Sequence, residues 1–125
     1  MACPYERTED RLESQWQTNF LSHFLLTNLL LPKLLLSPNP RIMNASSMAY
    51  LASDILYNDP GFSNGETYNP ISAHAQSKTA NIIFSVELNR RLAKRGVESF
   101  ALLPGAIDTG LVRHFTLEML VEKFE

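Results

Sequence analysis

One long helical segment between two short apolar runs limits what this chain can fold into. Residues 70–94 carry apolar side chains at helical spacing, begin with Pro70 and end before Gly96, which suits a helix C-cap. The flanking runs, residues 41–46 and 97–103, are short and read as strands. Strand, long helix and strand predict a parallel pair joined by a right-handed crossover. The predicted fold class is α/β, with part of a doubly wound (Rossmann-like) parallel sheet and long helices on its faces.

The other segments are also punctuated by local signals. Thr8 suits the N-cap of a first helix. Over residues 25–36 this helix is apolar nearly all round, which predicts cover on both sides, by its own core and by a partner subunit. Pro32 removes a backbone donor and predicts a kink. Residues 48–70 read as a loop with room for a short helical turn, and 111–124 as a last helix.

Composition excludes several classes of function. The chain has 125 residues, 45% apolar content and a net charge of −2, as in an ordinary globular domain without a nucleic-acid partner. Its single cysteine, Cys3, cannot form an internal disulfide and fits a reducing, cytoplasmic compartment. Residues 20–36 are too short and too polar for a membrane span, and no His/Cys spacing suggests a metal site.

A polar pair near the start of the long helix carries the first candidate chemistry. His74 and Lys78 are four residues apart, so their Cβ atoms lie roughly 5–6 Å apart on one helical face. A lysine there would depress the pKa of a neighbouring acid or base and could also hydrogen-bond a ligand. A solvated polar face is the alternative for such a pair. Ligands bind beyond the carboxyl ends of strands in doubly wound sheets, which supports a site here.

The residues around this pair resemble a known motif. Residues 73–81, Ala-His-Ala-Gln-Ser-Lys-Thr-Ala-Asn, resemble the active-site helix of the short-chain dehydrogenase/reductase family. The nearest branch includes retinol-dehydrogenase-like and WW-domain oxidoreductase-like proteins and reads Ala-Tyr-x-Gln-Ser-Lys-x-Ala-Asn here. His74 therefore takes the place of the catalytic tyrosine, and Lys78 that of the lysine that lowers the tyrosine pKa and binds the nicotinamide ribose. The resemblance implies hydride transfer between a small-molecule alcohol and a carbonyl, with NADP or NAD as cofactor.

Three further segments carry the resemblance in the same order. Asn19 takes the place of the catalytic asparagine that holds a water in the proton relay; an amide that satisfies a kinked backbone is the alternative. Ser47 takes the place of the serine that binds the substrate carbonyl oxygen; a turn after the strand is the alternative. The cofactor-binding residues implied by the family are Lys78, Pro104, Gly105, Ile107 and Thr109.

Two departures from the family pattern imply weak or absent activity. None of the five glycines forms the family's Gly-rich pyrophosphate loop. We expect residues 1–125 to be the C-terminal portion of a single NAD(P)-binding Rossmann-type domain whose N-terminal βαβ half is missing. An imidazole at position 74 also reaches less far than a phenol, and misplacement by about 1 Å costs on the order of 100-fold in rate. The alternative is a non-catalytic dimerisation or interaction fragment, a homo-oligomer that associates through its two long helices.

Two other enzyme classes are weaker alternatives. Asp108-Thr109-Gly110 is the aspartic protease signature, but that site needs a β-rich fold to present paired carboxylates. A hydrolase triad of Ser47, His74 and Asp108 is conceivable, yet the chain lacks Gly-x-Ser-x-Gly and its strained elbow. The oxidoreductase interpretation is therefore preferred.

Overall fold

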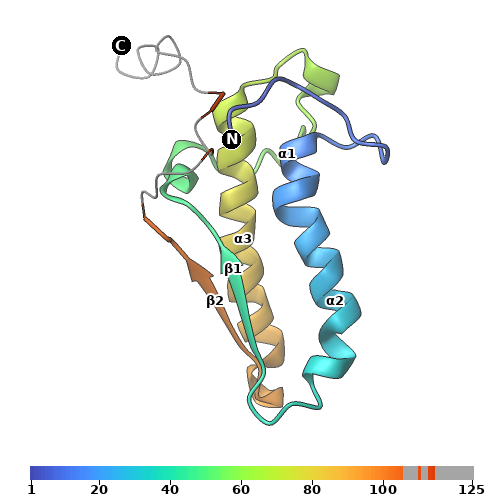
Figure 1. Cartoon of the computed structure of the whole chain (residues 1–125), viewed down its shortest axis with the longest axis vertical. Helices are drawn as coiled ribbons and strands as arrows, with labels where there is room; N and C mark the ends of the chain where they lie inside the picture. The colour runs from blue at the N-terminus through green and yellow to red at the C-terminus, as the bar shows by residue number, and fades with distance from the viewer. Residues whose placement is uncertain (106–109, 111–112, 115–125) are drawn as a thin grey trace.

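The computed structural model describes residues 1–105, 110 and 113–114, and three helices and two strands organise the chain (Figure 1). In chain order the elements are α1 (Ser14–Trp16), the π-helical turn η1 (Gln17–Leu21), α2 (Ser22–Leu34), β1 (Arg41–Ala45), the 3-10 turns η2 (Met48–Ala52) and η3 (Ser63–Gly65), α3 (Pro70–Leu92), the 3-10 turn η4 (Ala93–Arg95) and β2 (Glu98–Leu102). The predicted helix over 111–124 lies outside the described residues.

The two strands form the parallel pair that the sequence predicts. Arg41 lies opposite Glu98 and Ala45 opposite Leu102, and their order in the sheet is β1-β2. The crossover between them is α3, which packs against both strands (Figure 1). The α/β class is therefore confirmed, as part of a Rossmann-like arrangement.

Local chemistry fixes both ends of α3. The side chain of Asn69 accepts hydrogen bonds from the backbone N–H groups of Ile71 and Ser72, which satisfies two donors of the first turn. Pro70 occupies the first helical position, where its missing N–H costs nothing. The turn η4 ends at Gly96, whose φ of 78° lies in the left-handed region that glycine adopts without strain.

The apolar core lies at the lower end of α3 in Figure 1, between the strands and α2. The rings of Phe20 in η1 and Phe24 in α2 pack against Phe84 there, with centroid distances of 6.2 Å and 5.1 Å. Burial of each large apolar side chain contributes about 1.5–3 kcal/mol. The buried members are Ile42, Phe84, Leu88, Leu92 and Val97, and Phe20, Leu31, Leu34 and Leu35 pack against them.

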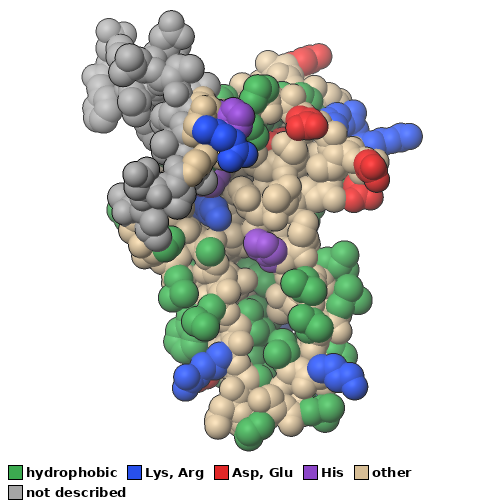
Figure 2. Space-filling view, in the orientation of Figure 1, with side chains coloured by type: hydrophobic (Ala, Val, Ile, Leu, Met, Phe, Trp, Pro, Cys, Tyr) green, Lys and Arg blue, Asp and Glu red, His purple; other side chains and the backbone are tan. Residues whose placement is uncertain are grey.

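The second helix is covered on one side only by the described residues. Leu31 and Leu34 pack on the core, as expected, but Leu25, Leu29 and Leu30 are exposed. Figure 2 shows hydrophobic side chains gathered over this part of the surface. Pro32 lies inside α2 and does not end it. Among the described residues, we find no helix that combines the length and the hydropathy of a membrane span.

The first helix begins later than the sequence predicts. Thr8 does not cap it; the carboxylate of Glu13 accepts hydrogen bonds from the N–H groups of Gln15 (2.9 Å) and Trp16 (2.7 Å). Arg7 and Glu13 form an antiparallel bridge, so the residues between them form a reversing turn and not the first turn of a helix. A carboxylate at this position also suits the positive end of the helix dipole.

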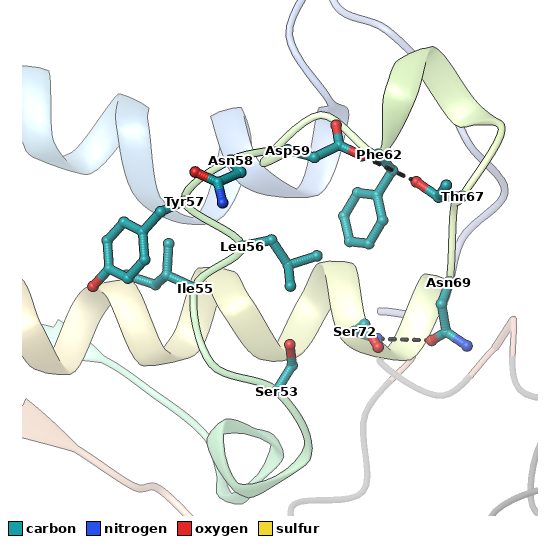
Figure 3. Close-up of a pocket in the computed structure, with 10 residues that line it drawn as sticks. All are labelled: Ser53, Ile55, Leu56, Tyr57, Asn58, Asp59, Phe62, Thr67, Asn69 and Ser72. Carbon is teal, nitrogen blue, oxygen red and sulfur yellow. Dashed lines mark hydrogen bonds between the residues drawn. The ribbon is translucent and has the colours of Figure 1, made fainter.

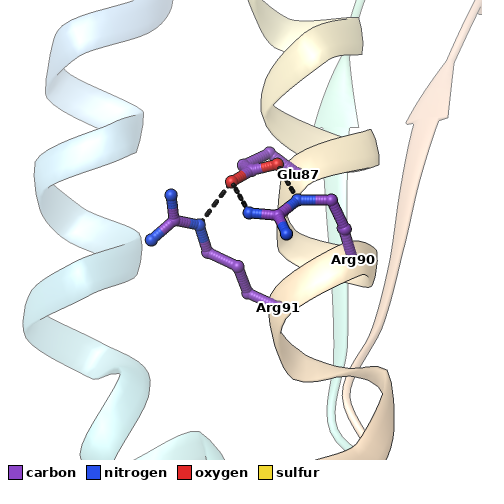
Figure 4. A network of polar contacts seen from close by, with 3 residues as sticks. All are labelled: Glu87, Arg90 and Arg91. Atoms are coloured by element: carbon purple, nitrogen blue, oxygen red, sulfur yellow. Dashed lines mark hydrogen bonds and ion pairs between the residues drawn. The ribbon is translucent and has the colours of Figure 1, made fainter.

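The outer face of α3 carries a local ion-pair network (Figure 4). Glu87 accepts from Arg90 at 2.7 Å and from Arg91 one residue further on. These hydrogen bonds lower the pKa of the Glu87 carboxyl. Because all three side chains face solvent, the network adds little to the stability of the fold.

Candidate active site

The candidate site lies where β1 ends against the first half of α3. Lys78 Nζ donates a hydrogen bond to the carbonyl oxygen of Ala45, the last residue of β1, at 3.1 Å. Ser46 Oγ donates to the carbonyl oxygen of Lys78 at 2.9 Å. The proximity of the strand end to this helix, which the sequence predicts, is therefore present in the structure.

Lys78 is half-buried at this strand end. Burial removes water from its ammonium group and lowers its pKa. Among the described residues, the Ala45 carbonyl is its one hydrogen-bond acceptor, and an ammonium has three hydrogens to donate. Two remain for a ligand.

His74 is buried on the inner face of α3, with 4% of its surface exposed. A solvated polar face, the alternative from the sequence, is therefore wrong for this residue. Neither ring nitrogen has a protein hydrogen-bond partner among the described residues. Burial, the charge of Lys78 and the chain's amino terminus lower the pKa of His74 to about 4. The imidazole is consequently neutral at pH 7.

Asn19 faces α3 from the π-helical turn η1. Its Nδ2 donates to Ser77 Oγ at 3.1 Å, and Ser77 Oγ donates to the carbonyl oxygen of His74 at 2.6 Å. Its own carbonyl oxygen accepts from Asn81 Nδ2 at 3.1 Å. Single π-turns inside α-helices occur frequently at functional sites, because they re-aim one residue of the helix. The turn here directs Asn19 at the helix that carries His74 and Lys78.

Ser47 follows the end of β1 and is half-buried in extended backbone. Its Oγ accepts a hydrogen bond from Ala49 N at 3.2 Å, so it caps the short turn η2. This matches the turn alternative that the sequence leaves open. Because a hydroxyl both donates and accepts, the cap leaves the Ser47 O–H able to donate to a ligand.

Pro104 and Gly105 follow β2 and are exposed. Gly105 has a φ of 80°, which favours glycine, and open space lies where a side chain would begin. The remaining two predicted cofactor contacts, Ile107 and Thr109, lie outside the described residues, as does Asp108.

Asn81 is the polar residue that the sequence reasoning did not assign to the site. It is 1% exposed, and its Nδ2 bonds to main-chain oxygens of both η1 and β1. Position 81 lies seven residues, or two helical turns, after His74, so both belong to one inner stripe. The signal in the sequence was that polar residues, and not leucines, occupy the inner stripe of this part of the helix.

A pocket of about 610 Å³ lies on the opposite side of α3 (Figure 3). Ser72 belongs to its wall, and Gln76 holds its loop by accepting from Leu56 N and donating to the Pro60 carbonyl. At about 100° per residue, Ser72 lies about 120° and Gln76 about 160° around the helix axis from Lys78. The other lining residues are Ser53, Ile55, Leu56, Tyr57, Asn58, Asp59, Phe62, Thr67 and Asn69. This pocket is separate from the candidate site.

Metal ligands do not gather in the described part of the chain. No three His, Cys, Asp or Glu side chains there lie close enough together to hold an ion. The chemistry available at the strand end is therefore that of an amine, an imidazole, hydroxyls and amides.

Comparisons with known proteins give homologous sequences and homologous structures. No protein-family model matches the chain. Human retinol dehydrogenase 13 is 47% identical over 114 residues, which cover 91% of this chain and 34% of the relative. Human retinol dehydrogenase 14 is 43% identical over 120 residues (96% and 35%), and human retinol dehydrogenase 12 is 40% identical over 121 residues (97% and 38%).

A solved structure agrees with these relatives. An uncharacterized protein from Mycobacterium paratuberculosis has a TM-score of 0.77 and 42% sequence identity, over 91% of this chain and 41% of that chain. The chain thus spans about a third of the length of the curated relatives it matches. At these identities over nearly the whole of its own length, the chain is homologous to retinol dehydrogenases, which are members of the short-chain dehydrogenase/reductase family.

Proposed function

We propose that this chain carries the proton-handling side of an NAD(P)-dependent site for hydride transfer between an alcohol and a carbonyl. The observation that carries the proposal is the convergence of Lys78 and Asn19 on the end of β1, where Ser47 also lies. The names of the relatives support the reaction class and make retinol the first alcohol to test. Residues 1–125 would then form the C-terminal portion of one NAD(P)-binding Rossmann-type domain.

The residues at the strand end fit the nicotinamide end of a dinucleotide. The half-buried ammonium of Lys78 has hydrogens left to donate to ribose hydroxyls, as the family pattern implies. Pro104, Gly105, Ile107 and Thr109 would hold the carboxamide. A bound NADP or NAD would supply the ring carbon that gives or receives the hydride. We expect weak affinity, because no Gly-rich loop for the pyrophosphate is present in the sequence.

Proton transfer at this site is impaired, because His74 stands where the family has tyrosine. With a pKa of about 4, the imidazole of His74 holds a proton in only about one molecule in a thousand at pH 7. As a base it is correspondingly weak, since an efficient catalytic group has a pKa near the working pH. We therefore propose that this chain turns over alcohols and carbonyls slowly, if it binds them.

Coenzyme titration tests the proposal directly. We expect saturable quenching or enhancement of NADH or NADPH fluorescence by the chain, abolished by Lys78→Ala. Lys33→Ala is the matched control, because Lys33 is exposed in the last turn of α2, at the end of that helix opposite to η1, which carries Asn19. Absence of saturable binding, or equal effects of the two substitutions, would contradict the proposal.

A second candidate function is self-association through the long helices, as a non-catalytic interaction fragment. The specific observation is the exposed apolar surface of α2, and Ile83 and Val86 of α3 are exposed as well. Exposed apolar side chains that gather on one helix indicate an interaction surface, whereas single exposed ones do not. A second copy of the chain carries the same surface and could cover it in a symmetric dimer.

Sedimentation velocity distinguishes this candidate. Leu29→Glu should dissociate a homo-oligomer formed by α2, whereas Leu51→Glu, at a residue of nearly equal exposure (67% against 68%) on η2, should not. A monomeric wild-type chain at micromolar concentration would refute the oligomer. If the coenzyme affinity does not change with the protein concentration, coenzyme binding does not depend on self-association, and the oxidoreductase proposal stands whatever the oligomeric state.

A further inference from the structure

The side chain of Asn81 joins three parts of the candidate site. Its Nδ2 donates to the carbonyl oxygen of Asn19 in η1 at 3.1 Å and to that of Ala45 at the end of β1, also at 3.1 Å. A carboxamide nitrogen carries two hydrogens, so both bonds form at once. One buried amide on α3 thereby ties the π-turn to the strand end.

The Ala45 carbonyl oxygen also accepts the hydrogen bond of Lys78 Nζ at 3.1 Å. A carbonyl oxygen has two lone pairs, so it accommodates the amide and the ammonium together. The direction of this carbonyl therefore governs where the ammonium lies, and Asn81 holds that direction. Asn81 is 1% exposed, and its two bonds are protected from competition with water.

A neutral donor is the chemical requirement at position 81. A cationic side chain would place a like charge beside Lys78 and repel it. A carboxylate would lack both donor hydrogens and would attract the ammonium of Lys78 away from the Ala45 carbonyl. Asparagine supplies two hydrogens without a charge.

We propose that Asn81 is a positioning residue, which fixes the ammonium group of Lys78 and the main-chain oxygen of Asn19 relative to the end of β1. The inference rests on the proposed function, because that function gives Lys78 its ligand-binding role. It deepens that proposal by adding a residue that touches neither cofactor nor substrate and acts through Lys78 and Asn19.

The same helix offers a matched control. Asn89, eight residues further along α3, donates from Nδ2 to the carbonyl oxygen of Ser99 at 2.6 Å and accepts from Ser99 N at 2.8 Å. It also ties α3 to a strand through two hydrogen bonds, but it bonds to neither Ala45 nor Asn19. Asn81→Ala and Asn89→Ala therefore remove equal groups, and both should lower Tm by similar amounts, on the order of 5 °C.

The readout that a merely structural role would not move is the titration of the Lys78 amine. Competitive acylation of the chain across alkaline pH, read by mass spectrometry and without cofactor, follows each lysine separately. We expect Asn81→Ala to raise the pKa of Lys78 from its lowered value toward the ordinary one, because the vacated space admits water. Asn89→Ala should leave it unchanged. His74 is neutral throughout this pH range and adds no charge.

A second pair of variants keeps the test valid where the alanine variant does not fold. Asn81→Asp keeps the side-chain size and adds a negative charge, so it should raise the pKa of Lys78, whereas Asn89→Asp should not. An unchanged Lys78 titration in both position-81 variants, or an equal change in the position-89 variants, would overturn the proposal.

Coenzyme binding separates this inference from the proposed function. Suppose that the Lys78 titration responds only to substitutions at position 81, but neither NADH nor NADPH binds to the chain. This result would refute the proposed function and support the positioning of Lys78 by Asn81. Saturable coenzyme binding with Lys78 insensitive to position 81 would refute the positioning role alone.

Discussion

The two halves of α3 are buried to a similar degree but contain different side chains. The buried residues of the first half are mostly polar, and those of the second half are mostly apolar. The first half buries His74, Gln76, Ser77 and Asn81 beside three small alanines, and the second half buries Phe84, Leu88 and Leu92 beside Ser85. The change falls near the level at which β1 ends, on the side where Lys78 meets Ala45.

This difference separates the part of the helix that stabilises the fold from the part suited to binding. Apolar burial contributes free energy directly, whereas a buried polar group lowers stability unless it is hydrogen-bonded. The side chains of Gln76, Ser77 and Asn81 each bond to neighbouring elements, but neither ring nitrogen of His74 has a protein partner among the described residues. Departures from good local packing are expected at functional sites, and His74 is the clearest one here.

Removing apolar volume from the second half should have the largest effect on stability. Leu88→Ala deletes a side chain that is 7% exposed in the core cluster and should lower the free energy of unfolding by about 2–5 kcal/mol. Leu51→Ala, at an exposed leucine, should change it by less than about 0.5 kcal/mol. Urea unfolding measures both. Equal effects would show that the second half does not carry the core.

Replacing the imidazole of His74, whose ring nitrogens have no partner among the described residues, should increase stability, in contrast to Leu88→Ala. His74→Phe replaces the imidazole by a larger aromatic ring without a polar atom and should raise the free energy of unfolding by about 1–2 kcal/mol, because no buried nitrogen is left without a partner. His23→Phe, at an exposed histidine of α2, is the control and should give no gain. A loss of stability in His74→Phe would mean that the imidazole makes a stabilising contact in solution.

Acid should destabilise the fold through the same residue. The folded-state pKa of His74, about 4, lies below the unfolded value of about 6.5, so between these pH values the unfolded chain binds more protons. The stability that depends on the neutral imidazole is full above pH 6.5 and is lost as pH falls toward 4. We expect a loss of about 1 kcal/mol between pH 7 and pH 5.5, absent in His74→Phe. Parallel pH profiles of the two chains would disprove the assignment to His74.

The smallest effect is expected on the outer face of α3. Glu87→Gln breaks the ion pairs with Arg90 and Arg91, but all three groups are solvent-exposed. Thermal unfolding should therefore give the wild-type Tm within error. A clear drop would require that these charges contribute more than exposed pairs usually do.

Local signals were sufficient to predict the strands and the limits of α3. Pro70 and Gly96 mark its two ends, and the short runs beside it have room only for strands. The position of Lys78 near the end of β1 follows from the general rule for parallel sheets. The residues of the motif could thus be placed in the fold before any contact was known.

Features that depend on distant contacts could not be predicted in this way. The bond between Asn81 and Asn19 joins residues 62 positions apart, and the π-turn that carries Asn19 has no local sequence signal. The burial of His74 likewise depends on what packs across it, not on its own helix. The apolar side chains all round α2 predict that the helix is buried, but they do not predict which of its sides packs against the rest of this chain.

Turnover by a position-74 variant tests the central proposal, that His74 limits proton transfer at this site. In the presence of NADPH or NADH and a carbonyl substrate, His74→Tyr should raise turnover by about 100-fold or more over the wild-type chain, because a tyrosine restores the family's proton donor. His23→Tyr, the same substitution at an exposed position, should not change it. Robust wild-type turnover that His74→Tyr leaves unchanged or lowers would contradict the account.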